Sequence, residues 1–220
     1  MTSGLFITFE GVDGCGKSTQ LAHCDAWLRA EGHDVLLTRN PGGTALGTEI
    51  RRILLHHPGY VSPTAELLLY IADRAQHMDE CVAPALQAGR IILCDRYHDS
   101  TLAYQGFGRG LDISEITQLN ALATHGRAPD LTFLFDGPPE ALRQRVANRG
   151  AADRLESEQL AFYERVAQGF RTLAAQEPQR FVTLDARESI ETLQAAVAEA
   201  VRRRLPIQAT RAKVSDESPA

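Results

Sequence analysis

Residues 11–18 read Gly-Val-Asp-Gly-Cys-Gly-Lys-Ser, which is the G-x-x-x-x-G-K-S spacing of a phosphate-binding loop. An apolar run, Leu5–Phe9, precedes this loop, and a helix-forming stretch, Lys17–Ala30, follows it. A strand, a glycine turn and a helix in this order aim backbone N–H groups and a helix N-terminus at a single point, where an anion binds. The sequence therefore predicts a nucleotide-phosphate site at residues 11–18.

The residue types inside the loop fit this chemistry. Its glycines permit backbone torsions and a close approach to phosphate that a Cβ atom would block. We expect Lys17 to reach the β- and γ-phosphates and Ser18 to ligate Mg²⁺. Cys15 could be a reactive thiol at a helix N-terminus, but a small residue that fills a loop position is the favoured interpretation and gives it no chemical role. The residues predicted to hold the nucleotide phosphates are Gly11, Val12, Asp13, Gly14, Cys15, Gly16, Lys17, Ser18 and Thr19.

Composition sets broad limits on the chain. With 220 residues and 44% hydrophobic content, it is long enough to bury one substantial core, so a single domain is expected. The net charge is -5 and the basic residues are spread out, which argues against a nucleic-acid groove. There is no charged-then-apolar leader and no apolar span of about 18 residues, so neither secretion nor membrane insertion is expected. The four cysteines form no C-x-x-C pair and fit reduced thiols in a cytoplasmic protein.

Short apolar or β-branched runs alternate with helical stretches. The predicted strands are Leu5–Phe9, Val35–Thr38, Arg90–Asp95, Leu131–Phe135 and Phe181–Leu184. Strands separated by helices predict the α/β class with a five-stranded, parallel, doubly wound sheet. Further helices are predicted over Leu46–His57, Thr64–Ala88, Ser114–Thr124, Pro139–Asn148, Ser157–Gln176 and Ser189–Arg204. Pro84 is expected to break or kink the second of these. Residues 1–206 are predicted to form the single domain, and residues 207–220, which contain little that can be buried, a disordered tail.

Charged residues follow the predicted strands, at the edge of the sheet where ligands bind in open α/β folds. Asp95 ends the third strand, where a carboxylate holds Mg²⁺ in phosphoryl-transferring folds; an Asp that caps the next turn is the alternative. Arg96 follows a strand end that is predicted to be buried, and it therefore needs an anion. Arg39 ends the second strand beside glycines, where a bidentate clamp on a second phosphate or a solvated surface arginine would each fit.

A helix that runs into a Gly/Ala-rich stretch predicts a lid at about residues 147–156. Arginines surround this stretch, and a loop that carries arginines can close over a phosphoryl group, exclude water and neutralise charge. An arginine-rich helix end that interacts with the helix dipole is the alternative. The phosphate-binding loop makes the lid the favoured interpretation.

Four segments together resemble the bacterial thymidylate kinase family. They are residues 11–18; residues 39–44, Arg-Asn-Pro-Gly-Gly-Thr; residues 67–74, Leu-Leu-Leu-Tyr-Ile-Ala-Asp-Arg; and residues 95–106, Asp-Arg-Tyr-His-Asp-Ser-Thr-Leu-Ala-Tyr-Gln-Gly. The last block is far more specific than the loop, and the match runs in register from about residue 5 to about residue 204. The resemblance implies the fold of P-loop nucleoside monophosphate kinases and transfer of the ATP γ-phosphoryl group to dTMP with Mg²⁺. It also implies a homodimer in the cytoplasm.

The resemblance implies how the phosphate and sugar of dTMP are held. Asp13 would lie beside the 3′-hydroxyl and the acceptor phosphate, and Arg39 and Arg96 would bind that phosphate. Tyr104 would crowd the 2′ position and disfavour ribonucleotides. A tyrosine on an apolar helix is ordinarily a core residue, which is the alternative for Tyr104.

The resemblance also implies how the base is read. Tyr70 would stack on thymine, Arg74 would donate to the base O4, and Pro41 would lie near the methyl group. Thr101 and Gln105 would contact the pyrimidine edge. Core packing for Tyr70 and a surface charge for Arg74 are the alternatives. The full set implied for dTMP is Asp13, Arg39, Pro41, Arg51, Tyr70, Arg74, Arg96, Ser100, Thr101, Tyr104 and Gln105.

Departures from the family pattern affect the predicted chemistry. Gly14 and Cys15 stand where one branch of the family has a basic residue, so the arginine for the transition state is expected from the lid, as Arg149 or Arg154 with Arg145 behind them. The predicted catalytic residues are therefore Lys17, Asp13, Arg96, Arg149 and Arg154, with Ser18 and Asp95 as metal ligands.

Two further departures lie in the acceptor site. Asn40 replaces a glutamate that is usual after the arginine, which changes the local hydrogen bonds. Tyr70 replaces a phenylalanine, so its hydroxyl needs a partner or water.

Other function classes fit less well. A GTP-hydrolysing switch needs an N-K-x-D tetrapeptide, which does not occur. A kinase for another nucleoside or nucleoside monophosphate shares the loop and remains the main alternative, although it should lack the arginine clamp or the pyrimidine-reading Gln105. A non-catalytic nucleotide-binding regulator would have no use for Lys17, Ser18, Asp95 and lid arginines together.

Overall fold

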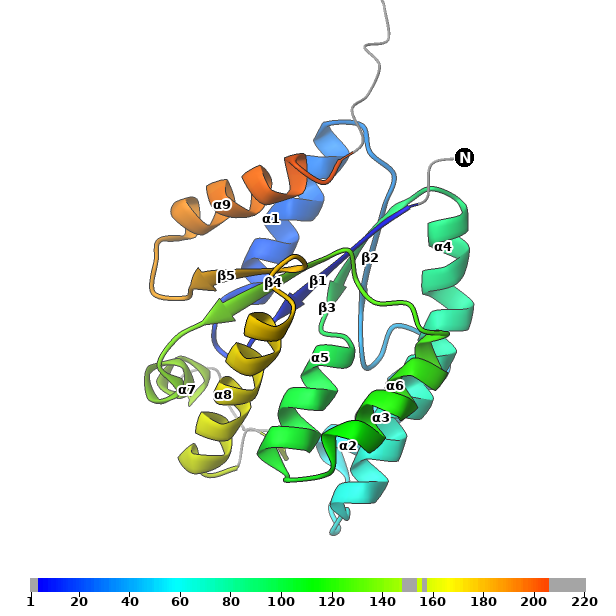
Figure 1. The fold of residues 1–220 in the computed structure, drawn as a ribbon, viewed down its shortest axis with the longest axis vertical. Helices are drawn as coiled ribbons and strands as arrows, with labels where there is room; N and C mark the ends of the chain where they lie inside the picture. The colour runs from blue at the N-terminus through cyan, green and yellow to red at the C-terminus, as the bar shows by residue number, and fades with distance from the viewer. Residues whose placement is uncertain (1–3, 148–153, 156–157, 206–220) are drawn as a thin grey trace, which may run out of the picture.

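A central sheet with helices on both faces forms the fold (Figure 1). The computed structural model describes residues 4–147, 154–155 and 158–205. The five strands run parallel in the order β2-β3-β1-β4-β5. They are β1 (Leu5–Glu10), β2 (Val35–Arg39), β3 (Ile91–Asp95), β4 (Leu131–Asp136) and β5 (Phe181–Asp185). The predicted α/β class with a five-stranded parallel sheet is confirmed, and each predicted strand agrees with an observed one to within one residue at either end.

Strand β1 lies in the middle of the sheet, with β3 on one side and β4 on the other. Both of its faces are covered, so Phe6, Ile7 and Phe9 are all fully buried. A near-continuous apolar run is what a central parallel strand requires. Of its two polar residues, Thr8 and Glu10, Thr8 shares a 2.8 Å hydrogen bond with Thr132 of β4. The loop at residues 11–18 therefore follows the central strand of the sheet.

The helices divide between the two faces of the sheet. Helices α1 (Lys17–Ala30) and α9 (Ile190–Arg202) pack together on one face, whereas α5 (His98–Thr101), η2 (Leu102–Gly108) and α8 (Leu160–Gln176) cover the other (Figure 1). The remaining helical elements are α2 (Ala45–His56), α3 (Pro63–His77), η1 (Met78–Val82), α4 (Ala83–Gln87), α6 (Ile113–Thr124) and α7 (Pro139–Ala147).

The stretch Thr64–Ala88, which was predicted as one helix, is helical throughout most of its length but is not a single regular α-helix. It consists of α3, the π-helical turn η1 and the short helix α4, which has Pro84 in its first turn. Because proline lacks an N–H, the α-helical ladder cannot pass through it unbroken. The predicted break is confirmed, and the ladder changes in the turn that precedes the proline.

Some predicted features fall on residues that the structure does not describe. Residues 148–153 and 156–157 of the predicted lid and the predicted tail at residues 207–220 lie outside the described residues. Within the described ranges, every helix is too short or too polar to cross a membrane.

Candidate active site

The loop at residues 11–18 presents uncapped backbone N–H groups at the start of α1. Gly16 is the N-cap residue with φ of 93°, and no side chain in the described part of the chain caps this helix. Helices α2, α3, α6 and α9 are instead capped by Thr44, Ser62, Asp112 and Ser189. The free N–H groups of α1 and its positive dipole end are therefore available to an anion.

Two further features shape this loop. A Cβ atom at Gly11, which has φ of 134°, would lie 2.5 Å from the Phe135 carbonyl oxygen, so a side chain would push the loop off the sheet. The Cys15 thiol is buried, and this burial raises its pKa. A raised pKa keeps the thiol protonated and unreactive, which agrees with its interpretation as a small residue that fills the loop.

Ser18 and Asp95 lie together beside the loop. The Ser18 hydroxyl donates to Asp95 Oδ2 at 3.4 Å, and Asp95 Oδ1 is buried without a hydrogen-bond partner among the described residues. An oxygen pair with one unsatisfied carboxylate oxygen fits a hard cation such as Mg²⁺, which takes only one or two protein ligands when substrate phosphates supply others. Consistently, no group of three or more His, Cys, Asp or Glu side chains in the described ranges could hold a metal by itself.

Asp13 joins the loop to the neighbouring strand ends. Its carboxylate accepts hydrogen bonds from Arg96 Nη2 at 2.8 Å, the Tyr104 hydroxyl at 3.1 Å and Lys17 Nζ at 3.5 Å. Burial acts to raise the pKa of Asp13, but the positive charges of Arg96 and Lys17 outweigh it and hold the pKa well below its usual range. Asp13 is therefore ionised and pairs with two cations from different segments, Lys17 at the start of α1 and Arg96 after β3.

Arg96 is held from several sides. Its backbone has φ of 67°, and its guanidinium lies over the Tyr104 ring, 5.1 Å from the centroid. Its Nη1 donates to Ser100 Oγ at 3.1 Å, and the Ser100 hydroxyl donates to Glu10 at 2.6 Å. Arg96 was predicted to need an anion, and the protein itself supplies part of that charge through Asp13.

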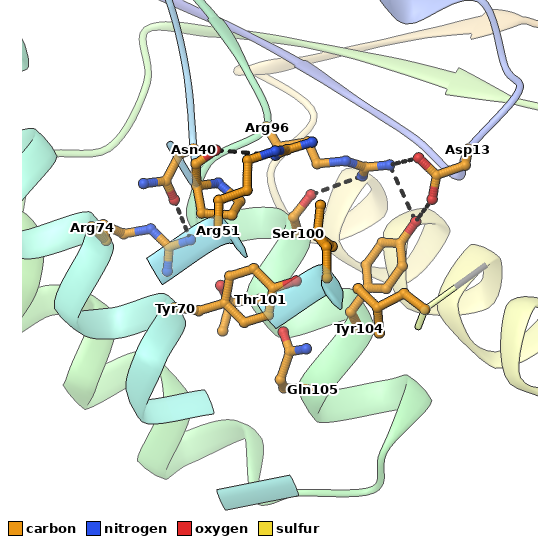
Figure 2. A pocket seen from close by; sticks show the side chains of 13 residues that line it. Asp13, Asn40, Arg51, Tyr70, Arg74, Arg96, Ser100, Thr101, Tyr104 and Gln105 are labelled. Carbon is orange, nitrogen blue, oxygen red and sulfur yellow. Dashed lines mark hydrogen bonds and ion pairs between the residues drawn. The ribbon is translucent and has the colours of Figure 1, made fainter. Parts of the chain in front are cut away.

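A cavity with about 520 Å³ of empty space, partly open to solvent, lies behind Asp13 (Figure 2). The cavity is lined by Asp13, Asn40, Pro41, Arg51, Leu55, Tyr70, Arg74, Arg96, Ser100, Thr101, Tyr104, Gln105 and Leu155. Of the residues predicted for the acceptor, the structure thus brings together all except Arg39.

Arg74 is almost fully buried at one end of this cavity. Its guanidinium donates to Asn120 Oδ1 at 2.6 Å, Asn40 Oδ1 at 2.7 Å and the Tyr97 carbonyl oxygen at 3.1 Å. The Asn40 amide nitrogen donates in turn to Asp73. Asn40 therefore connects Arg74 to Asp73, which is how the structure accommodates the residue that replaces the usual glutamate.

Gln105, which also lines the cavity, forms a second polar contact with Glu66 of α3. Gln105 Nε2 donates to Glu66 Oε1 at 2.8 Å, and both side chains are about 1% exposed. Thr101 Oγ1 is buried without a hydrogen-bond partner among the described residues. Tyr70 also lines the cavity (Figure 2), and no hydrogen bond within the described residues uses its hydroxyl. The cavity therefore has hydrogen-bonding capacity that the protein leaves open.

Arg39 and Arg51 flank Gly42. A Cβ atom at Gly42 would lie 2.9 Å from Arg51 Cδ and 3.8 Å from Arg39 Cδ. Arg51 lines the cavity and donates to the Pro41 carbonyl oxygen at 3.1 Å. Arg39 is exposed and does not line the cavity. Its contact with a second phosphate stays a prediction.

The lid arginines occupy different surroundings. Arg154 Nη2 pairs with Glu66 Oε2 at 2.5 Å, and its Nε donates to the Leu54 carbonyl oxygen at 2.8 Å. Arg145 Nη1 donates to the Ala186 carbonyl oxygen at 3.1 Å. Arg149 lies outside the described residues. Arg154 thus lies against α2 and α3.

Sequence reasoning missed several residues of the site. Glu10 ends β1 and accepts hydrogen bonds from the Tyr97 N–H at 2.7 Å and from Ser100. A carboxylate at the end of an apolar strand is the signal that had identified Asp95, and it could have identified Glu10 too. Leu55 and Leu155 line the cavity, but leucines in amphipathic stretches carry no signal that separates them from core residues.

Comparison with known proteins shows extensive similarity. A family model described as thymidylate kinase matches residues 9–197. The chain is 53% identical over 203 residues to a thymidylate kinase of Synechococcus sp. (strain JA-2-3B'a(2-13)), which covers 92% of this chain and 97% of that protein. It is 51% identical over 204 residues to a thymidylate kinase of Deinococcus radiodurans, and this match covers 93% of this chain and 99% of that protein. The crystal structure of thymidylate kinase from Ehrlichia chaffeensis matches with a TM-score of 0.73 at 35% identity, covering 90% of this chain and 99% of that one.

Proposed function

The chain belongs to the thymidylate kinase family, and from this premise we propose that the cavity behind Asp13 binds dTMP while residues 11–18 bind the phosphates of ATP. The observation that carries the proposal is the position of Asp13. This residue of the phosphate-binding loop also pairs with Arg96 at the cavity. A γ-phosphoryl group on the loop and an acceptor phosphate on Arg96 would therefore meet at one point, and positioning is most of what phosphoryl transfer requires.

In this proposal the acceptor phosphate lies among arginines. Arg96 and Arg51 line the cavity, and the exposed Arg39 side chain also approaches Gly42. The Tyr104 ring beneath Arg96 limits the space next to Asp13, which supports its role against a 2′-hydroxyl. Arg74, Thr101 and Gln105 would read the base, Tyr70 would stack on it, and Pro41 would lie near its methyl group.

On the donor side, Lys17 and the N–H groups of the loop would hold the β- and γ-phosphates. Lys17 is only 6% exposed, and its ammonium group pairs with Asp13, so its charge is already directed at the meeting point. Ser18 and Asp95 would hold Mg²⁺, and the orphaned Asp95 oxygen supports this assignment. When bound, Mg²⁺ would offset the negative charge on the phosphate oxygens of ATP.

We also propose a homodimer. Leu68 on α3 and Leu122 on α6 are 51% and 74% exposed, and these helices pack against each other. Exposed leucines on neighbouring helices are typical of an interface between copies. We expect Leu122→Glu to give a monomer by light scattering, whereas Ile190→Glu, on α9 and 49% exposed, should leave the dimer intact. Dimers of both variants would contradict this interface, and a monomeric wild-type chain would contradict the dimer itself.

We propose that the enzyme works in the cytoplasm without a nucleic-acid partner. Cys15, Cys24, Cys81 and Cys94 are all free thiols, which supports a reducing compartment.

The central test is an acceptor panel. We expect ADP release from ATP and Mg²⁺ to be stimulated strongly by dTMP and much less by dCMP, dGMP, dAMP and UMP. Equal stimulation by all of them, or none by dTMP, would contradict the proposal. Preference for another member of the panel would instead favour a kinase for a different acceptor.

Arginine substitutions separate binding from turnover. Arg96→Ala should mainly raise KM for dTMP, and loss of the decisive lid arginine should mainly lower kcat. The contacts of Arg154 with Glu66 and Leu54 make Arg149 the stronger candidate for that role. If Arg149→Ala and Arg154→Ala both leave kcat unchanged, neither of the two arginines predicted to be catalytic in the lid acts in the reaction.

A further inference from the structure

Glu66 of α3 is the common partner of residues from separate segments around the cavity. Its carboxylate is 1% exposed and receives Gln105 Nε2 at 2.8 Å and Arg154 Nη2 at 2.5 Å. Arg109 donates to both of its oxygens through Nε and Nη2, each at 3.2 Å. Burial acts to raise the pKa of Glu66, but the hydrogen bonds from Arg109 and Gln105 and the charges of Arg109 and Arg154 outweigh it and lower the pKa. Glu66 is therefore ionised.

An ionised carboxylate can only accept hydrogen bonds, so it determines which end of a neighbouring amide faces it. The amide of Gln105 must turn its nitrogen to Glu66, as the 2.8 Å contact shows. Its oxygen is then left for the cavity, and Figure 2 shows this oxygen turned toward Tyr70 and Thr101. Without such a partner the last torsion of a glutamine is broad and nearly two-fold, so either end could face the cavity.

The end that faces the cavity matters for base recognition. Thymine carries an N–H donor at N3, whereas cytosine has an unprotonated, accepting nitrogen at the same place. If the Gln105 amide oxygen is fixed toward the base, it can accept a hydrogen bond from N3–H of thymine. With cytosine, the same oxygen would face the accepting N3 nitrogen, and neither group could donate. Mismatches of this kind discriminate strongly, because buried polar groups are left unpaired.

We propose that Glu66 is a positioning residue that sets the preference for thymine over cytosine by fixing the amide orientation of Gln105. The proposal rests on the function proposed above, and it assigns Glu66 no contact with either substrate.

Glu66→Gln tests the proposal directly. Arg109 and Arg154 would draw the oxygen of the new amide, so its NH₂ group would face Gln105 and turn the Gln105 oxygen away from the cavity. We expect the ratio of kcat/KM for dTMP to that for dCMP to fall at least tenfold. Use of dUMP, which has the same N3–H, should fall in parallel with use of dTMP. An unchanged ratio in a folded variant, or an equal loss for every acceptor, would overturn the proposal.

Controls separate this role from a general disturbance. Arg109 Nη1 also donates to Glu158 Oε1 at 2.5 Å, and no hydrogen bond within the described part of the chain joins Glu158 to Gln105. Glu158→Gln removes this second carboxylate, and it should leave the ratio of kcat/KM for dTMP to that for dCMP unchanged. In a Gln105→Ala background, adding Glu66→Gln should not change the ratio further, since the two residues act as one unit. A further fall in that background, or an equal fall in Glu158→Gln, would overturn the proposal.

A measurement on the wild-type chain covers the case in which Glu66→Gln does not fold. In the isotope-labelled protein, dTMP should shift the NMR signal of the Gln105 side-chain carbonyl carbon and leave its Nε2 protons unshifted and slow to exchange. A shift of the Nε2 signals with little change at the carbonyl carbon would overturn the proposal. If the wild-type enzyme itself shows no preference for dTMP over dCMP, the proposed function is contradicted, and this result is distinct from any effect of the variants.

Discussion

Glu10 shows how a single residue at a strand end can support a site without facing it. It is fully buried, and it holds the segment after β3 through the Tyr97 N–H and the Ser100 hydroxyl. Burial and the negative charge of Asp99 raise the pKa of Glu10 to about 7, against the attraction of Arg96. Near neutral pH this carboxyl group therefore changes charge behind the proposed phosphate clamp.

The raised pKa predicts a pH dependence of stability. The folded protein binds the Glu10 proton more tightly than the unfolded chain, whose pKa is near 4.5, so stability is lost as the pH rises from about 4.5 to about 7. At roughly 1.4 kcal/mol per pKa unit, the loss is about 3 kcal/mol. Glu10→Gln should remove most of this slope when the free energies of unfolding in urea are compared at pH 5 and pH 7.5. Glu164→Gln, an exposed carboxylate on α8, is the control and should leave the slope unchanged. An unaltered slope in Glu10→Gln would show that Glu10 does not titrate in this range.

At this scale, sequence predicts which residues gather but not how they pair. Asp95 and Arg96 could be placed at the site because parallel strands bring their carboxyl ends to one edge. The pairing of Arg96 with Asp13, and of Gln105 with Glu66, depends on how η2 and α3 pack, which no local pattern encodes.

Among the elements, η2 and α8 approach each other closely through glycine. A Cβ atom at Gly169 of α8 would lie 2.7 Å from the Phe107 ring, and one at Gly108 of η2 would lie 2.7 Å from Phe162. Arg165 of α8 also donates to the Gly108 carbonyl oxygen at 2.8 Å. Since η2 carries Tyr104 and Gln105, this contact supports two residues that line the cavity.

Gly169→Ala should therefore destabilise the protein. Alanine is favoured over glycine in a helix by about 1 kcal/mol, but overpacking against Phe107 costs about 1–3 kcal/mol. We expect a lower midpoint of urea unfolding and a higher KM for dTMP, because η2 must shift. Gln168→Ala, at an exposed neighbouring position, should change stability by less than about 0.5 kcal/mol. A gain of stability in Gly169→Ala would show that the contact is loose.

The sequence predicts a strand or helix well where a pattern within that same segment of the chain specifies it. The strands and α1 follow from apolar runs and the glycine loop, and α1 begins and ends at the predicted residues. The predicted helix ranges do not include His98–Gly108, where the structure has α5 and the π-helix η2, although a position on an apolar helix is the alternative interpretation for Tyr104. This stretch contains Gly106 and Gly108, which lower its helix propensity, so packing against α8 is needed to stabilise it.

For the whole molecule, the strand order divides the site into two parts. The phosphate-binding loop leaves β1, whereas the arginines around the cavity come from segments that follow β2 and β3. The chain has a net charge of -5, yet Lys17, Arg51, Arg74 and Arg96 converge at this edge of the sheet. A local positive field in an acidic protein attracts phosphorylated ligands without attracting nucleic acid in general.

The two parts should respond separately to their ligands. A ligand at about 100 times its Kd stabilises the folded state by about 2.7 kcal/mol. Ser18→Ala should reduce the stabilisation given by Mg²⁺ and ATP and leave that given by dTMP unchanged. Arg74→Met should do the reverse, since Arg74 lies at the far end of the cavity from Asp13. Thermal unfolding with each ligand alone checks both outcomes, and parallel losses in either variant would show that the two parts are one cooperative unit.

The π-helical form of η2 allows the ligand contacts of this site to evolve by the loss of a single residue. A π-helix holds more residues per turn than an α-helix, and one residue more or less converts one into the other. Deletion of a single residue between Thr101 and Gly108 would leave a shorter regular helix that α8 could still cover. Because the wider turn accommodates the extra residue, the side chains beyond the deletion would keep their facing, and only those inside the turn would change theirs. One small deletion could thus exchange the contacts that Tyr104 and Gln105 make with the cavity, while the rest of the fold stays in place.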